Sequence, residues 1–327
     1  MFRRGFRSLL PALLALSPFA VAAQVQVTAK AFPGAQALPL MVAVSQGTFA
    51  RHGLKVELLF TQNSVELRED LAKGAIQVAH SAVDNAVAMV ESARQDVVIV
   101  SGGDGSMNEF FVQSDVRSLA ELKGRTVAVD APNTAYGLQA RKILRMHGLK
   151  EGADYSLKSV GGTLFRYRAM REDRQIAASM LNPPFSVEAP AAGLKSLGRA
   201  VDLLGPYQAT GAFVLRAWAL ANADTLERYL AALVEATRWT VAPQNRAAGV
   251  KLLLERFKLE PAVAERTWEV LADAKFGLAP DARFNDEGFR NVLALRAEIE
   301  GAWGGTPPAS SRYVDLVYYE RALARIR

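Results

Sequence analysis

The sequence predicts an α/β protein with two similarly wound lobes. Short β-branched segments alternate with segments of helical periodicity, which is the order of elements in a mainly parallel sheet flanked by helices. The alternation starts again after about residue 115, and the chain of 327 residues exceeds the length of one ordinary domain. From about Thr225 the sequence is nearly all helical. We expect these helices to pack on the first lobe, because its sheet needs cover on both faces.

The first lobe begins with strands that are separated by helices. Pro39 opens the first helix at a position where proline is tolerated, and Ser64 begins a second helix that ends near Gly74. A third helix starts at about Asn85. The predicted strands are short β-rich segments between turn residues: Val25–Ala29, Lys55–Phe60, Ile76–His80 and Val97–Ser101.

The second lobe repeats this order. Thr126–Asp130 is typical of a buried strand, and Pro132 ends it. Asn133 or Thr134 can cap the helix that follows, and Gly148 is a natural stop for that helix. The other predicted elements are a capping box at Ser118–Glu121, strands at Tyr155–Val160 and Ile176–Met180, and a helix from Gly161-Gly162-Thr163 through Met170.

Short internal identities support the repeat. The motif HGLK at His52–Lys55 recurs at His147–Lys150, and RED at Arg68–Asp70 recurs at Arg171–Asp173, in matching places in the order of elements. We expect residues 24–112 and 208–327 to form the first lobe and residues 113–207 the second, with crossings near Phe111–Asp115 and Leu204–Gln208. The expected C-terminal helices are Leu226–Val241, Arg246–Phe257, Pro261–Ala272, Asn285–Trp303 and one from about Val314.

Composition excludes several classes of protein. Half of the residues are apolar, so a large core is available, and the chain has no cysteine for disulfides, thiolate metal sites or a cysteine nucleophile. The histidines His52, His80 and His147 are scattered, which makes a zinc site improbable. Basic and acidic residues are interleaved. A net charge of +6 that falls to about +3 without the N-terminal arginines therefore does not predict nucleic-acid binding.

The N-terminus is predicted to be an export signal. Arg3, Arg4 and Arg7 precede an apolar segment at Leu9–Val21, and small residues follow it. This segment is shorter than a membrane span, and no cysteine follows it for lipid attachment. We therefore expect residues 1–23 to be a cleaved signal peptide, with the general secretory route favoured over the twin-arginine route, and the mature protein to be soluble and exported without a lipid anchor.

Polar turns follow several of the predicted strands. In an open α/β sheet, ligands bind at the carboxyl ends of the strands. These turns combine hydrogen-bonding Ser, Asn, Thr and Gln with Pro, Tyr, Phe and Met, which suits reversible recognition of a part-apolar small molecule between two lobes. For Asn133 or Thr134 alone, simple capping of a helix is an equally good interpretation. The candidate turns are Pro33–Gln36, Ser81–Asn85, Ser106–Asn108, Asn133–Tyr136 and Asn182–Phe185.

Catalytic constellations are hard to assemble from the same residues. The chain has no nucleophile elbow, phosphate loop or zinc-protease helix. Asp84 and Glu109 are carboxylates that no spacing brings together, and a helix-start charge and a solvated side chain explain them better. Arg166 lies just inside a predicted helix, where it is either an anion-binding residue or a plain surface arginine. The sequence predicts no catalytic residue, no metal site and no cofactor.

Five groups of residues match the pattern of a known family. They are Pro39, Ala43, Gly47, Phe49, Gly53, Leu54 and Val56; L-x-x-L-K-G-x-x-V-x-V at Leu119–Val129; Pro132–Thr134; Gly161-Gly162-Thr163 with Arg166; and Pro183-Pro184. In these residues, over about Val25–Arg216, the chain resembles the periplasmic substrate-binding proteins for nitrate, sulfonate, taurine and pyrimidine precursors (SsuA/THI5-like, also called NMT1-like). The resemblance implies a periplasmic protein with a type II periplasmic-binding fold, whose lobes close on a ligand and deliver it to the permease of an ABC importer in the inner membrane.

The resemblance also implies where the ligand lies. Two departures from the family pattern are Asp173–Ala177, where a Gly-x-x-Asp-Ala is common, and Asp84, which stands in a turn that is usually neutral in oxyanion-binding members. A carboxylate there disfavours nitrate or a simple sulfonate unless a cation such as Arg166 offsets it. A nitrogen-containing ligand, or an aromatic one stacked on Tyr136 or Phe185, fits better than a simple oxyanion. The expected ligand-binding residues are Gln36, Ser81, Asp84, Asn85, Asn108, Asn133, Thr134, Tyr136, Arg166 and Asn182.

Two other functions are compatible with the same scaffold. The family includes a pyrimidine-forming enzyme and a sulfinate-cleaving one, both of which look cysteine-dependent, and this chain has no cysteine. A ligand-sensing partner of a membrane receptor would have the same sequence features. The favoured interpretation is a monomeric, non-enzymatic binding protein that partners a small organic ligand and an ABC permease.

We predict that the mature protein begins at Ala23 or Gln24, because Ala20-Val21-Ala22-Ala23 ends the apolar segment with small residues. N-terminal sequencing of protein from the periplasm checks this. Recovery of an intact Met1 in a membrane fraction would contradict it.

Overall fold

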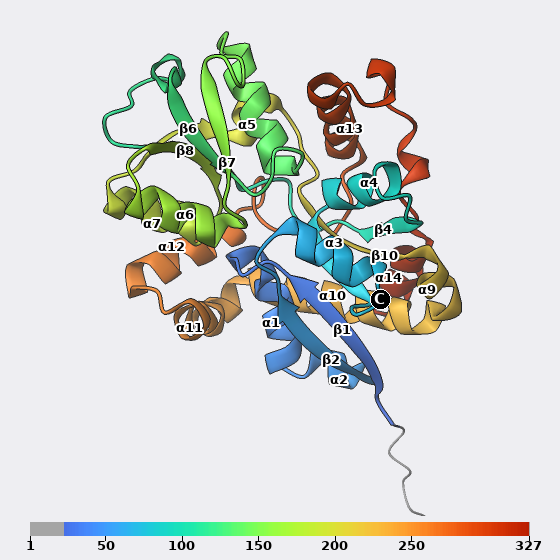
Figure 1. Cartoon of the computed structure of the whole chain (residues 1–327). Helices are drawn as coiled ribbons and strands as arrows, with labels where there is room; N and C mark the ends of the chain where they lie inside the picture. The colour runs from blue at the N-terminus through green and yellow to red at the C-terminus, as the bar shows by residue number, and fades with distance from the viewer. Residues whose placement is uncertain (1–22, 327) are drawn as a thin grey trace, which may run out of the picture.

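Two five-stranded sheets, each flanked by helices, form the framework of the molecule (Figure 1). The computed structural model describes residues 23–326, so the predicted signal peptide lies almost entirely outside the described residues. The first sheet has the strand order β2-β1-β3-β10-β4. Its strands are β1 (Val25–Ala31), β2 (Leu54–Phe60), β3 (Val78–Ala82), β4 (Val97–Ser101) and β10 (Thr210–Leu215).

The second sheet has the corresponding order β7-β6-β8-β5-β9. In each sheet the first three strands are parallel, and the fourth, β10 or β5, runs antiparallel to both of its neighbours. The prediction of two similarly wound, mainly parallel lobes is therefore confirmed. The strands are β5 (Glu109–Val112), β6 (Arg125–Val129), β7 (Tyr155–Ser159), β8 (Ile176–Leu181) and β9 (Lys195–Arg199).

The chain passes between the sheets at residues 102–108 and 205–209. The first crossing is earlier than the expected Phe111–Asp115, since β5 pairs with β8 and β9 in the second sheet. The expected lobe boundary at residue 112 is corrected accordingly. The antiparallel strands explain the error. β5 and β10 each enter a sheet directly after a crossing. No helix separates them from the crossing, so the alternation of strands and helices does not predict them.

Helices cover both sheets. The helices of the N-terminal part and of the second lobe are α1 (Leu38–Ser45), α2 (Thr48–Arg51), α3 (Ser64–Ala72), α4 (Asp84–Glu91), α5 (Ala135–Met146), α6 (Thr163–Glu172), α7 (Phe185–Glu188) and α8 (Ala200–Leu204). The C-terminal part contains α9 (Arg216–Ala221), α10 (Ala223–Val241), α11 (Arg246–Phe257), α12 (Pro261–Leu271), α13 (Asp286–Glu300) and α14 (Val317–Arg325). Short 3₁₀ turns are η1 (Ala35–Ala37), η2 (Leu119–Leu122), η3 (Ala189–Ala192), η4 (Pro243–Asn245), η5 (Ala302–Gly305) and η6 (Ser310–Arg312).

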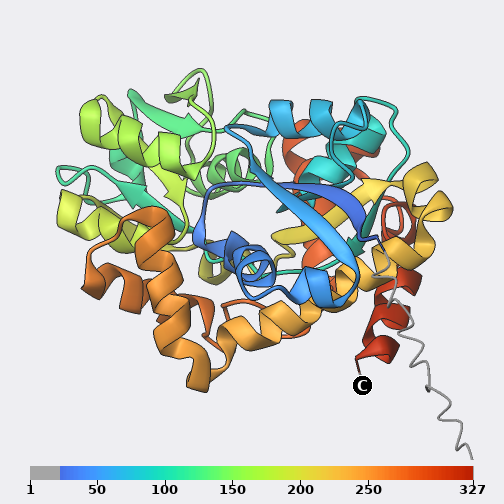
Figure 2. The same ribbon diagram turned by 90° about the horizontal axis from the view of Figure 1, so that it is seen from below.

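The C-terminal helices pack mainly, but not only, on the first lobe. Helix α10 lies against α1, α2 and α14, and in the view of Figure 2 it runs along the lower edge of the blue N-terminal helices. Helix α12 contacts α7 of the second lobe, and α13 contacts α5 of the second lobe. These two helices therefore join the lobes outside the crossings.

None of the helices in residues 23–326 combines the length and apolarity needed to cross a membrane.

The predicted helix caps differ in detail from the structure. Thr134 stands at the N-cap position of α5, but its hydroxyl donates to the Ala131 carbonyl at 2.7 Å and does not cap the helix. Ser118 likewise makes no side-chain cap, although Glu121 accepts from the Arg117 backbone N–H at 3.0 Å. For Thr134, the nearby Ala131 carbonyl thus competes successfully for the hydroxyl group.

We predict that Gly211→Ala lowers the free energy of unfolding by about 1–3 kcal/mol through overpacking. Gly211 lies on β10, where a Cβ would meet the Ser101 carbonyl oxygen at 2.4 Å and a Val83 methyl group at 2.7 Å. The control is Gly105→Ala, because a Cβ there would meet its nearest atom, the Tyr207 carbonyl oxygen, at 3.7 Å. Thermal unfolding compares the variants, and equal midpoints for both would contradict the packing argument.

Candidate functional site

A narrow cavity of about 100 Å³ lies between the two lobes. The first lobe contributes the carboxyl ends of β1 and β3 and residues that follow them, together with the first turn of α3 and one face of α10. The second lobe contributes residues that follow β6 and β8, and the first turns of α5 and α6. The wall includes Phe32, Leu40, Ser64, His80 and Leu233 from the first lobe, and Asp130, Gly162 and Thr163 from the second.

Most of the predicted ligand-binding residues line this cavity. Those that do are Gln36, Ser81, Asn85, Thr134, Tyr136, Arg166 and Asn182. Asp84, Asn108 and Asn133 are not part of its wall. The backbone carbonyl of Asn133 accepts a hydrogen bond from Arg296, and the Asn108 side chain bonds to Gln139 at 3.4 Å behind the wall. The carboxyl ends of the parallel strands thus bring most of the polar turns together, as expected.

Arg166 is fully buried and points its charge at the cavity without a carboxylate in contact. Its guanidinium donates to the Ser179 hydroxyl at 3.1 Å, to the Met180 and Gly161 carbonyls, and to the Thr163 hydroxyl at 2.8 Å. All of these acceptors are neutral. It also packs over the Tyr136 ring, 5.7 Å from the ring centroid. Burial lowers the pKa of Arg166, while the more distant Asp130 raises it, and the side chain keeps its charge.

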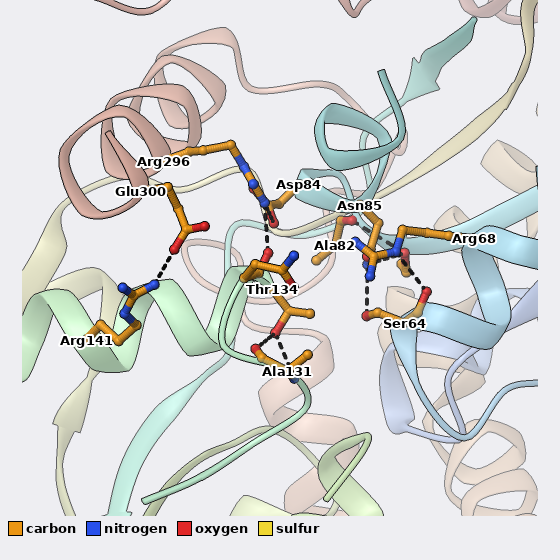
Figure 3. A network of polar contacts seen from close by, with 12 residues as sticks. Ser64, Arg68, Ala82, Asp84, Asn85, Ala131, Thr134, Arg141, Arg296 and Glu300 are labelled. Carbon is orange, nitrogen blue, oxygen red and sulfur yellow. Dashed lines mark hydrogen bonds and ion pairs between the residues drawn. The ribbon is translucent and has the colours of Figure 1, made fainter. Parts of the chain in front are cut away.

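Asp84 has a different role from the predicted one. Arg296 of α13 donates to both carboxylate oxygens of Asp84, from Nε at 2.9 Å and from Nη2 at 2.7 Å (Figure 3). Only 2% of the Asp84 side chain and 5% of the Arg296 side chain are exposed. Burial opposes the charge of Arg296, but Asp84 outweighs it and raises the pKa of the guanidinium. The Asp84 charge is therefore neutralised inside the protein and does not face a ligand.

Hydrogen bonds cross directly from one lobe to the other around the cavity. The Ser64 backbone N–H donates to the Asp130 carboxylate at 3.1 Å. The Gly162 N–H donates to the Gln62 carbonyl at 2.8 Å, and the Ala35 N–H donates to the Pro183 carbonyl at 3.0 Å. On one flank, Lys142 of α5 pairs with Glu298 of α13 at 2.7 Å, and Arg141 pairs with Glu300 (Figure 3). The two lobes are therefore in the closed arrangement.

The family of the chain follows from comparison with known proteins. A family model for the NMT1-like family matches residues 22–254, which is more than half of the chain. The protein belongs to the NMT1-like family. No curated protein sequence matches it significantly.

Solved structures share the fold of this NMT1-like protein. A protein from Bordetella bronchiseptica RB50 superposes with a TM-score of 0.79 at 21% identity, over 93% of this chain and 98% of that one. The periplasmic nitrate-binding protein NrtA from Synechocystis PCC 6803 gives 0.77 at 14% identity, over 93% and 89%. The alkanesulfonate-binding protein SsuA from Xanthomonas axonopodis pv. citri, bound to MOPS, gives 0.70 at 19% identity, over 90% and 98%. The desulfurization enzyme DszB also shares the fold. The resemblance seen in the sequence is thereby confirmed.

Sequence reasoning missed several residues of the site. His80, Asp130 and Ser64 all line the cavity of this NMT1-like protein. Each stands at the end of a predicted strand or the start of a predicted helix, so position alone could have nominated them. Arg296 had no such signal, because it lies in the middle of a C-terminal helix.

Among the described residues, no group of three or more His, Cys, Asp or Glu side chains is placed to hold a metal ion.

We predict that Asp84→Asn lowers the free energy of unfolding by about 3–5 kcal/mol, because it leaves the buried Arg296 without a counter-charge. The matched control is Asp202→Asn. Asp202 pairs with Arg199 through the same two-bond geometry, at 2.7 and 2.9 Å, but on the surface, so its loss should cost at most about 1 kcal/mol. Chemical denaturation measures both variants. Equal losses would show that burial of the Asp84 pair is not what matters.

Proposed function

We propose that this protein is an extracytoplasmic solute-binding protein that captures a small organic anion between its lobes and passes it to the permease of an ABC importer. The observation that carries the proposal is the buried Arg166 charge at the cavity wall, with neutral protein acceptors only. A buried charge is costly unless it is paired. A ligand anion in the cavity supplies the missing partner.

Two other buried cations show what a fully compensated charge looks like in this chain. Arg296 holds both oxygens of Asp84, and Lys30 contacts the carboxylates of Glu66 and Asp70. Both lie in the protein framework. Arg166 differs in having no carboxylate within ion-pair distance among the described residues, and in facing the cavity. One N–H of its Nη1 has no acceptor in the described chain and remains for a ligand.

Asp130 also lines the cavity, but its charge does not cancel the preference of Arg166 for an anionic ligand. Its carboxylate accepts the Ser64 N–H from the opposite lobe, so it has a structural partner already. It also lies within electrostatic reach of Arg68, which donates to the Ser64 carbonyl on the same side. With Asp84 neutralised by Arg296, the argument for a nitrogen-containing ligand loses its basis, and an anion is the better choice.

The rest of the wall indicates an organic ligand. Apolar side chains line much of the cavity, including Phe32, Leu40, Leu233 and Leu278. Such a wall binds an apolar body by removing its surface from water. The first turns of α5 and α6 direct their positive ends at the same cavity, which favours a negative group there.

The family and the fold support the proposed partner and location. The neighbour NrtA is a periplasmic nitrate-binding protein, and the neighbour SsuA is an alkanesulfonate-binding protein. The predicted signal peptide supports export of this chain to the same compartment. We therefore assign the ligand-loaded protein, as a monomer, to an ABC permease of the inner membrane.

We predict that aryl and alkyl carboxylates and sulfonates raise the unfolding temperature in a thermal-shift panel, while their primary amides do not. Arg166→Gln should weaken the binding of a hit by about 1.5–3 kcal/mol, the range for hydrogen bonds to charged groups, or roughly 10- to 150-fold. Calorimetry measures this change. The probe should be recovered unchanged after incubation.

The control is Arg168→Gln, an exposed arginine on the same helix, which should leave affinity unchanged. Far-UV circular dichroism without ligand verifies that both variants are folded. Equal binding of acids and amides, or full affinity in folded Arg166→Gln, would overturn the proposal of an anionic ligand.

A further inference from the structure

We propose that His80 recognises the end of the ligand remote from Arg166, by donating one hydrogen bond from Nδ1 to a neutral acceptor. This inference rests on the proposed function and deepens it, because it names the class of organic anion. It follows from the position of the His80 ring, its contact with Tyr229 and the character of the wall around it.

His80 lies on β3 with its side chain directed at α10. Its Nε2 is 2.8 Å from the Tyr229 hydroxyl oxygen, and the ring forms part of the cavity wall. Nδ1 has no hydrogen-bond partner among the described residues, and it is not among the fully enclosed polar atoms. This nitrogen is therefore open to the cavity.

Tyr229 determines which ring nitrogen carries the proton. Its side chain is fully buried, stacked on Phe49 with ring centroids 4.9 Å apart. Within the described chain its hydroxyl bonds only to His80. A buried hydroxyl hydrogen needs an acceptor, and Nε2 of a neutral imidazole is the acceptor present. The hydrogen-bond network thus assigns the imidazole proton to Nδ1, where it faces the cavity as a donor.

The ring is neutral in this environment. Burial lowers the pKa of His80 to about 3, and no carboxylate contacts it. A second anionic group on the ligand would have to be buried beside an uncharged ring, at a high desolvation cost. A neutral oxygen acceptor, such as a carbonyl, ether or hydroxyl, has no such cost.

The surroundings of His80 are otherwise apolar or already satisfied. Tyr229, Leu233 and Thr237 follow one another at intervals of four residues on one face of α10, and the latter two line the cavity. The Thr237 hydroxyl donates to the Leu233 carbonyl at 2.7 Å, so its hydrogen is already used. Leu40 and Leu278 also line the cavity. On the face formed by His80, Leu233 and Thr237, the donor that remains for a ligand is His80 Nδ1.

These observations define a ligand class. The acid group lies at Arg166 in the second lobe, an apolar body lies against the leucines, and a neutral acceptor meets His80 in the first lobe. A monoanion that also carries a neutral acceptor can bond to Arg166 of the second lobe and to His80 of the first lobe at once.

The first test measures the tautomer of His80 without any ligand. The full-length mature protein is labelled with ¹⁵N, and its three histidines are examined by two-bond ¹H–¹⁵N correlation at about pH 8. His147 and His52 serve as internal references. Nδ1 of His147 bonds to the Ile143 carbonyl and Nε2 of His52 bonds to Glu235, so they show the two tautomers. We expect His80 to be protonated on Nδ1; a proton on Nε2 would overturn the proposal.

The second test uses two probes of nearly the same shape, 4-acetylbenzoate and 4-isopropylbenzoate. Only the first carries a neutral acceptor opposite its acid group. We expect calorimetry to show a preference for the acetyl probe of about five- to 150-fold, the equivalent of one buried hydrogen bond. In His80→Phe the ratio of the two affinities should fall to about one, whatever the change in the absolute affinity for each probe. The conservative Tyr229→Phe, which frees Nε2, should reduce the preference and stay folded.

The outcomes separate this inference from the proposed function. If the acids of the panel bind but folded His80→Phe retains the preference for the acetyl probe, His80 does not bind the neutral acceptor of the ligand. The proposed anion-binding function is unaffected by that result. If no acid binds, the proposed function fails. In that case the tautomer measurement still decides whether His80 offers a donor to the cavity.

Discussion

The ion pair between Asp84 and Arg296 is the interaction on which the rest of the structure depends. It joins the first turn of α4 to α13, and the same guanidinium also donates to the Asn133 carbonyl of the second lobe at 2.9 Å. Three segments that are distant in sequence therefore meet at one buried charge. Because a buried charge tolerates little displacement of its partner, this contact fixes the turn before α5 relative to the first lobe. That turn forms part of the cavity wall.

Two buried arginines in this protein have opposite relations to the cavity. Arg296 is compensated within the protein and stabilises the closed arrangement. Arg166 has hydrogen bonds to neutral oxygens, which fix its geometry, but no counter-ion in contact. A side chain that is rigidly held yet electrostatically incomplete is well suited to binding a ligand, since the cost of ordering it has been met by folding.

Closure of the lobes involves more than the two crossings. Backbone hydrogen bonds from Gly162 and Ala35 span the cavity directly, and the ion pair of Lys142 with Glu298 links α5 to α13 on one flank. The surface pairs are individually weak and screened by salt. The closed arrangement therefore depends more on the hydrogen bonds around the cavity than on the surface ion pairs.

The sequence by itself determined the alternation of strands and helices, the two-lobe division and several polar residues of the cavity wall. It could do so because hydrophobic periodicity is local, and because parallel strands deliver their following turns, such as Ser81, Thr134 and Asn182, to one edge. Only the tertiary structure decided the roles of the charges. Asp84 and Arg296 are separated by 212 residues, so nothing local showed that this carboxylate is neutralised. The same holds for His80, whose donor atom is set by Tyr229 on a distant helix. Long-range pairing of polar groups, not local propensity, determines what the cavity offers to a ligand.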